Sequence, residues 1–240
     1  QIGPNEIKSE LAKSLTDYMV PSAYVQLDKM PLTPNGKVNT KVLPEPKSNK
    51  SESGRLPKNE LEKTGNAVYV YTFAAGEENK TLDTVQDVYE YLIENHFDRN
   101  DCLVALGGGV VGDLTGFSAA TYLRGIKFIQ VPTSLLAQVD SSIGGKTGVD
   151  FRAYKNMVGA FHQPKLVYMN VSTLSTMDER DYLSGMGEVV KHGLIRDKKF
   201  FDWLKINHEK ICSQDNETLI EMDYHNCSIK REVVEKDPTE

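Results

Sequence analysis

The chain has 240 residues, a formal net charge of −6 and 39% hydrophobic residues, so it can hold one large domain or two smaller ones. This acidic balance argues against a phosphate-backbone binding surface, and we expect no nucleic-acid partner. The three cysteines form no C-x-x-C pair, and no apolar stretch approaches the roughly 18 residues that cross a bilayer, which together predict a cytoplasmic protein without a membrane partner.

The first part of the chain, residues 1–46, predicts a small α+β piece. Glu6–Tyr18 has the apolar period of a short helix, and Tyr24–Leu27 has the composition of a brief strand. Pro31–Lys37 predicts a turn, because proline fixes φ and Asn-Gly accepts a positive φ. Residues 47–64 are polar and rich in Ser, Pro and Lys, so we expect a linker.

Residues 65–174 predict an α/β domain, because strand and helix patterns alternate along them. Such alternation favours a parallel sheet covered by helices. The expected elements are strand Val68–Phe73, helix Thr81–Asn95, strand Leu103–Leu106, helix Leu114–Tyr122 and strand Ile126–Val131.

Residues 175–240 predict the start of a second, helical domain, because strand patterns fade after Leu174. Helical periods appear in Gly187–Leu194, Lys199–Trp203 and Leu219–Glu235. The expected fold class is α/β, with an incomplete Rossmann-like parallel sheet domain followed by this helical region.

A glycine-rich motif follows one predicted strand. Gly107–Gly112 fits G-x-G-x-x-G, in which the backbone approaches a pyrophosphate at the N-terminus of a helix. A glycine-rich turn without a ligand fits the same pattern, and no acidic residue follows Val131 to hold a ribose. Gly145-Lys146-Thr147 is not a Walker A loop, because Asp140 stands in place of its first glycine.

Polar residues gather in the stretch that follows. Cations, a carboxylate and an amide close to glycines predict a loop around an anionic, hydroxylated ligand, although solvated loop residues give the same pattern. These residues are Arg124, Asp140, Lys146, Lys155 and Asn156. Further on, Glu188, Lys191 and His192 share one helix face, which fits either a surface salt bridge or a metal-ligating carboxylate beside a substrate-binding lysine.

Several motifs, in order over roughly 175 residues, resemble the 3-dehydroquinate synthases, a family of sugar-phosphate cyclases. They are Gly76–Lys80, Gly107–Phe117, Gln130–Thr147, Lys155-Asn156 and Gly187–Lys191. The resemblance implies NAD-dependent, phosphate-eliminating carbocyclisation of 3-deoxy-D-arabino-heptulosonate 7-phosphate in the shikimate pathway. It also implies zinc or another divalent metal as a Lewis acid, NAD as the hydride carrier, a sugar-phosphate substrate and a homodimer.

The same resemblance assigns roles to residues. The implied NAD site contains Glu77, Lys80, Gly108, Gly109, Asp113, Thr133, Ser134, Asp140 and Thr176. The implied substrate site contains Asp140, Lys146, Asn156, Lys191 and Lys230, with Arg124 and Lys155 near the phosphate. Glu188 is the implied metal ligand, and its two histidine partners are expected beyond Glu240. None of the five histidines present fits that pattern, and His192 is expected to pack or to face solvent.

A second resemblance concerns the first forty residues. Tyr18–Pro21, Pro31–Val38 and Leu43-Pro44 are similar to the C-terminal end of adenylation domains of nonribosomal peptide synthetases. The resemblance implies that Lys37 matches a lysine that contacts the carboxylate substrate and the adenylate phosphate.

Three other interpretations remain open at this point. One is a related cyclase that acts on a different sugar phosphate. Another is a peptide-synthetase module in which the cyclase part is incidental. The third is a non-catalytic chain in which two incomplete families meet near Glu62-Lys63-Thr64.

Overall fold

The computed structural model describes residues 64–237, together with Ile7, Glu10, Leu11, Lys13, Leu27 and Pro31. The chain divides into two units, Gln1–Val68 and Tyr69–Glu240, and the second is described below. The elements expected before residue 64, the α+β piece, the linker and Lys37 lie outside the described residues. None of the described helices has the length and apolar character needed to span a membrane.

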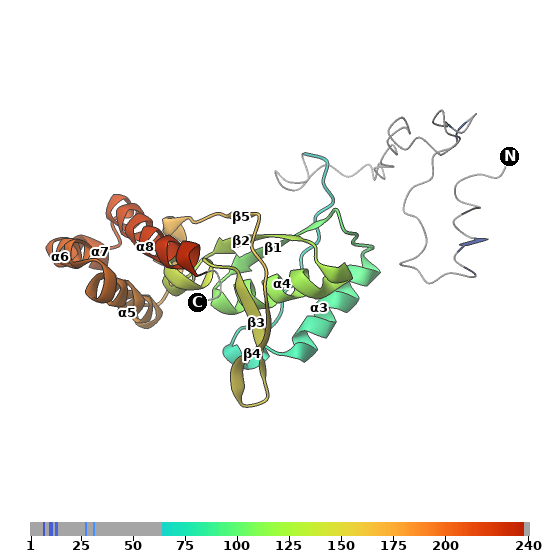
Figure 1. Ribbon diagram of the computed structural model, residues 1–240, viewed down its shortest axis with the longest axis horizontal. Coiled ribbons are helices and arrows are strands. Elements are labelled where there is room, and N and C mark those ends of the chain that lie inside the picture. Colours follow the sequence, from blue (N-terminus) through green and yellow to red (C-terminus); the bar gives the residue numbers. More distant parts are fainter. Residues whose placement is uncertain are drawn as a thin grey trace. The chain divides into compact units, whose positions relative to one another are not determined.

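Helices and strands alternate in the first half of this unit, and helices alone follow in the second (Figure 1). The elements are η3 (Glu77–Asn79), α3 (Leu82–Glu94), β1 (Cys102–Gly107), α4 (Gly109–Thr121), η4 (Tyr122–Arg124), β2 (Lys127–Pro132), η5 (Ala137–Ser141), β3 (Lys146–Phe151), β4 (Tyr154–Phe161), β5 (Leu166–Val167), η6 (Val171–Thr176), α5 (Glu179–Arg196), α6 (Lys198–Ile206), α7 (His208–Cys212) and α8 (Asn216–Lys236).

The parallel sheet has the strand order β1-β2-β5. β1 pairs with β2 from Cys102 opposite Lys127 to Gly107 opposite Pro132, so the carboxyl ends of both strands meet at one edge. In β1 the side chains of Leu103 and Ala105 are buried, as the two-residue period of a strand requires. The predicted parallel α/β arrangement is confirmed here.

α4 packs against β1, β2, β3 and α3, so it is covered on several sides. Its buried residues include Leu114, Phe117 and Ala119, which join Phe128 of β2 in one hydrophobic cluster. Gly116 lets α4 approach β3 closely, because a Cβ atom there would lie 2.4 Å from Thr147 Cγ2. α4 is longer than the predicted helix because its first turn is formed by the glycine motif itself.

β3 and β4 form an antiparallel hairpin that the sequence did not predict. Val149 pairs with Val158 and Phe151 with Tyr154, so Lys155–Met157 face the single residue Asp150. This bulge places Asn156 at φ 55°, a left-handed conformation that asparagine tolerates better than most residues. The backbone N–H of Asn156 donates to Asp150 Oδ1 at 2.8 Å, and this hydrogen bond stabilises the bulge.

The helices α5 to α8 form a second group with its own hydrophobic cluster (Figure 1). Leu135 and Val139, which follow β2, are fully buried in this cluster. Val139 belongs to η5, a π-helical segment that contacts α4, α5 and α8. The buried Gln138 donates from Nε2 to Pro132 O at 3.1 Å, which ties η5 to the end of β2.

The predicted strand Val68–Phe73 is wrong, because residues 66–75 form no strand. β1 has no strand partner on its other edge among the described residues, so this segment has no ladder to join. Its side chains pack elsewhere: Tyr69 lies against Phe97, and the Tyr91 hydroxyl donates to Val70 O at 3.0 Å. Aromatic and β-branched composition alone does not make a strand without such a partner.

Candidate active site

A cavity of about 450 Å³ lies where α4, η5, the β3–β4 hairpin and α8 meet. Five residues that the sequence placed in the site line it, although they come from five different elements. They are Asp113 of α4, Asp140 of η5, Lys146 of β3, Asn156 of β4 and Lys230 of α8. The lining is thus rich in charge of both signs.

The glycine motif lies at the N-terminus of α4, directly after β1. Gly108 precedes the first helical residue, Gly109, and neither carries a side chain that would cover the helix terminus. A Cβ atom at Gly108 would lie 3.3 Å from Ser134 Oγ, and one at Gly109 would lie 3.2 Å from Ser141 Oγ. The open backbone and the positive end of the helix therefore fit the pyrophosphate of a dinucleotide.

Lys80 is buried beside the cavity and joins two of its walls. Its ammonium donates to Asp113 Oδ2 at 2.5 Å and to Asn156 Oδ1 at 2.6 Å. Burial raises the pKa of the Asp113 carboxyl, and the hydrogen bond from Lys80 opposes that rise. The family resemblance placed Lys80 in the NAD site, and in the structure its ammonium has two protein partners.

Asp140 and Lys230 form a second ion pair, between η5 and α8. Lys146 lies at the start of β3 and is exposed at the cavity wall. Lys230 and Lys146 thus bring two cations to the same cavity as the carboxylate of Asp140. Two ammonium groups and a carboxylate suit a phosphorylated, hydroxylated ligand, as the sequence analysis expected.

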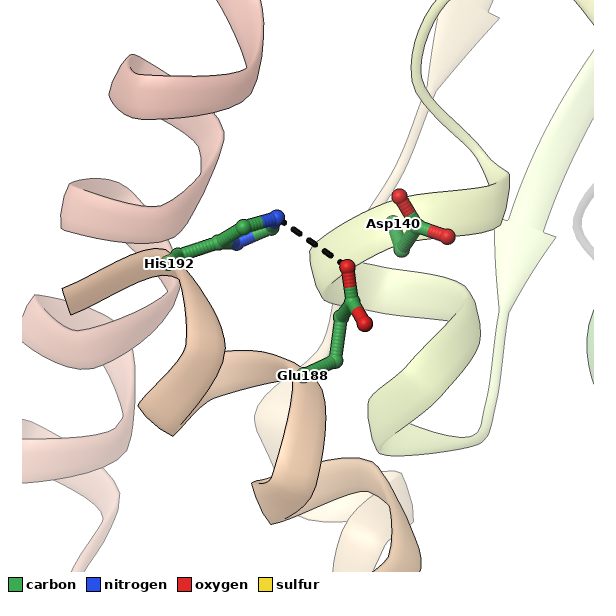
Figure 2. A group of neighbouring side chains, drawn as sticks. All are labelled: Asp140, Glu188 and His192. Atoms are coloured by element: carbon green, nitrogen blue, oxygen red, sulfur yellow. Dashed lines mark ion pairs between the residues drawn. The ribbon is translucent and has the colours of Figure 1, made fainter. Parts of the chain in front are cut away.

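Glu188, Lys191 and His192 lie on one face of α5, as their spacing predicted. Lys191 and His192 both contact Glu188 Oε1, and the His192 Nε2 atom lies 3.2 Å from it. Figure 2 shows that the His192 ring and the Glu188 carboxylate point toward Asp140 on η5. One ligand atom from each of Asp140, Glu188 and His192 lies within 4.8 Å of the others, so the three can hold a metal ion.

The position of His192 agrees with the expectation that this residue packs or faces solvent. His192 packs in the interior, with a side chain that is 6% exposed, and its Nε2 is directed at Glu188. The helical spacing of Glu188 and His192 was visible in the sequence. Their approach to Asp140, which is 48 residues from Glu188 and 52 from His192 along the chain, was not visible.

Some predicted residues are not brought to the cavity wall. Arg124 follows α4, whose 13 residues, about 20 Å in length, separate it from the glycine turn. Thr176 is exposed at the end of η6. Glu77 and Lys155 form an exposed ion pair of 3.2 Å with each other. Thr133 follows β2, and its amide N–H donates to Gly107 O at 2.9 Å.

Three residues that were not predicted also line the cavity, namely Ser141, Ile143 and Phe161. Ser141 and Ile143 lie inside the motif Gln130–Thr147, so their neighbourhood was marked without their roles. Phe161 belongs to the unpredicted hairpin. Asn226 of α8, which forms a hydrogen bond with His192, was also not predicted, because it lies in no motif.

The fold and the site together define an α/β sugar-phosphate cyclase architecture. Residues 70–184 match the family model of the 3-dehydroquinate synthase N-terminal domain, and residues 185–240 match that of the C-terminal domain. Through residues 70–240 the chain belongs to the 3-dehydroquinate synthase family.

Curated relatives agree with this assignment. The chain is 56% identical over 176 residues to the 3-dehydroquinate synthase of Acetivibrio thermocellus, covering 73% of this chain and 49% of that protein. It is 53% identical over 176 residues to that of Halorhodospira halophila, covering 73% and 50%. The chain therefore spans about half the length of the curated relatives that it matches. The family models begin at residue 70.

Solved structures show the same fold. ValA, a 2-epi-5-epi-valiolone synthase from Streptomyces hygroscopicus subsp. jinggangensis with NAD⁺ and Zn²⁺ bound, superposes with a TM-score of 0.67 at 29% identity. That alignment covers 70% of this chain and 48% of ValA. A 2-deoxy-scyllo-inosose synthase complexed with carbaglucose-6-phosphate, NAD⁺ and Co²⁺ gives a TM-score of 0.51 at 38% identity, over 53% of this chain and 35% of that one.

Proposed function

We propose that the complete protein is a 3-dehydroquinate synthase, which converts 3-deoxy-D-arabino-heptulosonate 7-phosphate to a carbocycle with loss of phosphate. The observation that carries the proposal is the cavity in which Asp113, Asp140, Lys146, Asn156 and Lys230 converge from five elements. An identity of about 50% to enzymes of that name supports the same reaction. The expected shikimate-pathway role and homodimer belong to this proposal.

NAD and a divalent metal are the proposed cofactors, because the chain contains residues suited to bind each of them. Gly108, Gly109 and Ser134 form the backbone-lined turn for the pyrophosphate. Glu188 is the proposed first metal ligand. When bound, NAD supplies a temporary hydride acceptor, and the metal supplies Lewis acidity at a substrate hydroxyl.

The chain's own residues bind and orient the substrate in this proposal. Lys146 and Lys230 supply positive charge for the phosphate and carboxylate groups. Asp140 stands beside Lys230 and can accept a hydrogen bond from a substrate hydroxyl. Asn156 is held in position by Lys80, so the bulge presents its amide to the cavity in one orientation. Lys155 and Arg124 remain proposed phosphate contacts, and Lys191 a proposed substrate contact.

A calorimetric titration of the chain with NAD tests the proposed cofactor site. The expected result is saturable binding to one site per chain, which Gly108→Val weakens because its side chain meets Ser134 and covers the helix terminus. Gly187→Ala is the matched control, because that exposed glycine of α5 has no atom within 4 Å of an added Cβ. Equal NAD affinity in Gly108→Val and the parent chain would contradict the proposal.

A related cyclase reaction on another sugar phosphate is the second candidate, because structural relatives carry such names. Identity is 29% to ValA and 38% to the inosose synthase, below the values of about 50% for 3-dehydroquinate synthases. Release of phosphate from a panel of sugar phosphates separates the two. Turnover restricted to a substrate other than the heptulosonate phosphate would favour the second candidate.

We also propose that residues 1–46 derive from the end of an adenylation domain. Lys37 and its neighbours lie outside the described residues, so the resemblance rests on their sequence alone. ATP–pyrophosphate exchange with amino acids tests for adenylation. We expect no exchange, because the matching segment covers only about forty residues and lacks a nucleotide-binding core.

A further inference from the structure

Three residues from different segments form a closed ring of hydrogen bonds beside the cavity. The backbone N–H of Asp150 donates to Lys80 O at 2.8 Å, and the backbone N–H of Asn156 donates to Asp150 Oδ1 at 2.8 Å. The Lys80 ammonium closes the ring by donating to Asn156 Oδ1 at 2.6 Å. Each residue thus donates one of these bonds and accepts another, and the segment before α3 is tied to both strands of the hairpin.

This ring decides which atom of the Asn156 side-chain amide is left for a ligand. An ammonium carries only donors, so the amide atom that faces Lys80 must be the oxygen, Oδ1. The other atom, Nδ2, carries two N–H donors and has no hydrogen-bond partner in the part of the chain that the structure describes. Because Asn156 is exposed and lines the cavity, these donors are available to an acceptor oxygen there.

The backbone of Asn156 depends on Asp150. Its φ of 55° is left-handed, and the residue lies in a bulge, where the regular ladder of hydrogen bonds is interrupted. The Asp150 carboxylate accepts the N–H of this bulged residue in place of a ladder partner. Loss of that acceptor removes the bond that fixes the bulge, and with it the direction in which the Asn156 side chain leaves the backbone.

The charge of Asp150 is of the wrong sign for direct contact with a phosphorylated ligand. Asp150 is half-buried, and it is not among the described residues that line the cavity. By Coulomb's law alone, a carboxylate beside the site weakens the binding of an anion, so its removal should strengthen binding. A residue that orients Asn156 has the opposite effect, because its removal should weaken binding. The two roles are therefore distinguished by the sign of one change in affinity.

We propose that Asp150 is a positioning residue of the site, which together with Lys80 holds Asn156 with its Nδ2 N–H groups directed at an acceptor oxygen of the bound sugar phosphate. The inference rests on the proposed function for the identity of the ligand. It adds to that function a residue outside the cavity lining and a fixed polarity for the Asn156 amide.

A calorimetric titration of the full chain with 3-deoxy-D-arabino-heptulosonate 7-phosphate, in the presence of NAD, tests the inference. We expect Asp150→Ala to bind about tenfold more weakly, as the loss of one hydrogen bond allows. Asp150→Asn loses the same charge but keeps an acceptor oxygen, so we expect it to restore most of the affinity. Asp197→Ala is the matched control, because this half-buried carboxylate also accepts a backbone N–H, that of Lys199 at 2.9 Å, but lies on no element of the cavity wall.

A double-mutant cycle shows whether Asp150 acts through Asn156. Asn156→Gly deletes the amide, and glycine tolerates the left-handed backbone of the bulge. In this background Asp150→Ala should cause no further loss of affinity, since the side chain that it orients is gone. Asp150→Ala that binds as tightly as the parent chain, or more tightly, would overturn the inference. So would an equal loss of affinity with and without the Asn156 side chain.

NMR of the Asn156 side-chain amide gives a readout on the parent chain itself, which does not require any variant to fold. We expect its Nδ2 proton resonances to shift when the sugar phosphate is added, and inorganic phosphate serves as a second probe. A shift with inorganic phosphate but not with the sugar phosphate would count against the proposed substrate and leave the positioning role standing. Resonances that neither probe moves would contradict the inference.

Discussion

Lys80 and Asp113 form an ion pair of 2.5 Å in which the lysine side chain is only 4% exposed and the aspartate 19% exposed. The pair joins the segment before α3 to the second turn of α4, and Asn156 of the hairpin accepts a further hydrogen bond from the same ammonium. Three elements that form one side of the cavity therefore share a single cation.

Replacement of this cation is expected to destabilise the fold. Lys80→Met leaves Asp113 buried without its partner, which costs about 3 to 5 kcal/mol in comparable buried pairs. Urea unfolding at pH 7 measures the change. Lys155→Met is the control, because its pair with Glu77 is exposed and should contribute less than about 1 kcal/mol. Similar losses in both variants would show that burial does not set the strength of the Lys80 pair.

Asp223 of α8 predicts a pH dependence of stability. Burial raises the pKa of its carboxyl to about 7, and neither oxygen has a hydrogen-bond partner among the described residues. The folded state therefore holds its proton more tightly than the unfolded state, whose pKa is near 3.8. Stability falls as the pH rises from about 4 toward 7, by up to about 4 kcal/mol.

Asp223→Asn removes this titration. We expect the variant to equal the parent chain near pH 4.5 and to be more stable at pH 8, as measured by urea unfolding at both values. Asp202→Asn is the control, because Asp202 has a half-exposed side chain paired with Lys205. An unchanged difference between pH 4.5 and 8 in Asp223→Asn would contradict the role of this carboxyl.

A side chain added at Gly116 should clash with β3, against which α4 packs closely. The Cβ atom of alanine there would lie 2.4 Å from Thr147 Cγ2 and 3.2 Å from a ring carbon of Phe128. Gly116→Ala should therefore cost about 1 to 3 kcal/mol of folding free energy. Gly187→Ala, in open space on α5, should instead stabilise by about 0.5 to 1 kcal/mol. Thermal unfolding compares the two, and the same sign in both would refute the packing argument.

The side chain of Gln138 links η5 to the end of β2, and we expect its hydrogen bonds to stabilise the fold. Its Nε2 donates to Pro132 O at 3.1 Å and to Asn170 O at 3.3 Å, and its side chain is fully buried. Gln138→Leu should cost about 1 to 3 kcal/mol, because the carbonyls of Pro132 and Asn170 lose a donor. Gln86→Leu on the exposed face of α3 should have little effect. Hydrogen exchange of η5 that stays unchanged in Gln138→Leu would argue against the link.

The sequence allowed the central elements to be predicted, because each has a strong local pattern. Helix α3 begins one residue after the expected Thr81, whose side chain caps it, and β1 and β2 match short apolar runs. The hairpin was missed, because its close approach depends on Gly148 and Gly159, and glycines give no strand period. The strand predicted at residues 68–73 was wrong, because this segment has the composition of a strand but no partner strand in the described part of the chain with which to pair.

Some residues of the candidate site could also be predicted from the sequence, whereas others could not. Asp140, Lys146 and Asn156 could be named, because each falls in a family motif, and Lys230 was named from the family resemblance as a whole. The approach of His192 to Asp140 and the hydrogen bond from Asn226 depend on how α5 and α8 pack against η5, which no local pattern encodes.

Residues that line the cavity are attached to two different hydrophobic clusters, so the cavity exists only while both regions are folded. Asp113 and Asn156 are attached to the cluster around α4, whereas Asp140 and Lys230 are attached to the cluster around α8. Partial unfolding of either region therefore abolishes the cavity, even while the other region keeps its own core. A ligand that contacts residues attached to both clusters should therefore oppose the partial unfolding of either region.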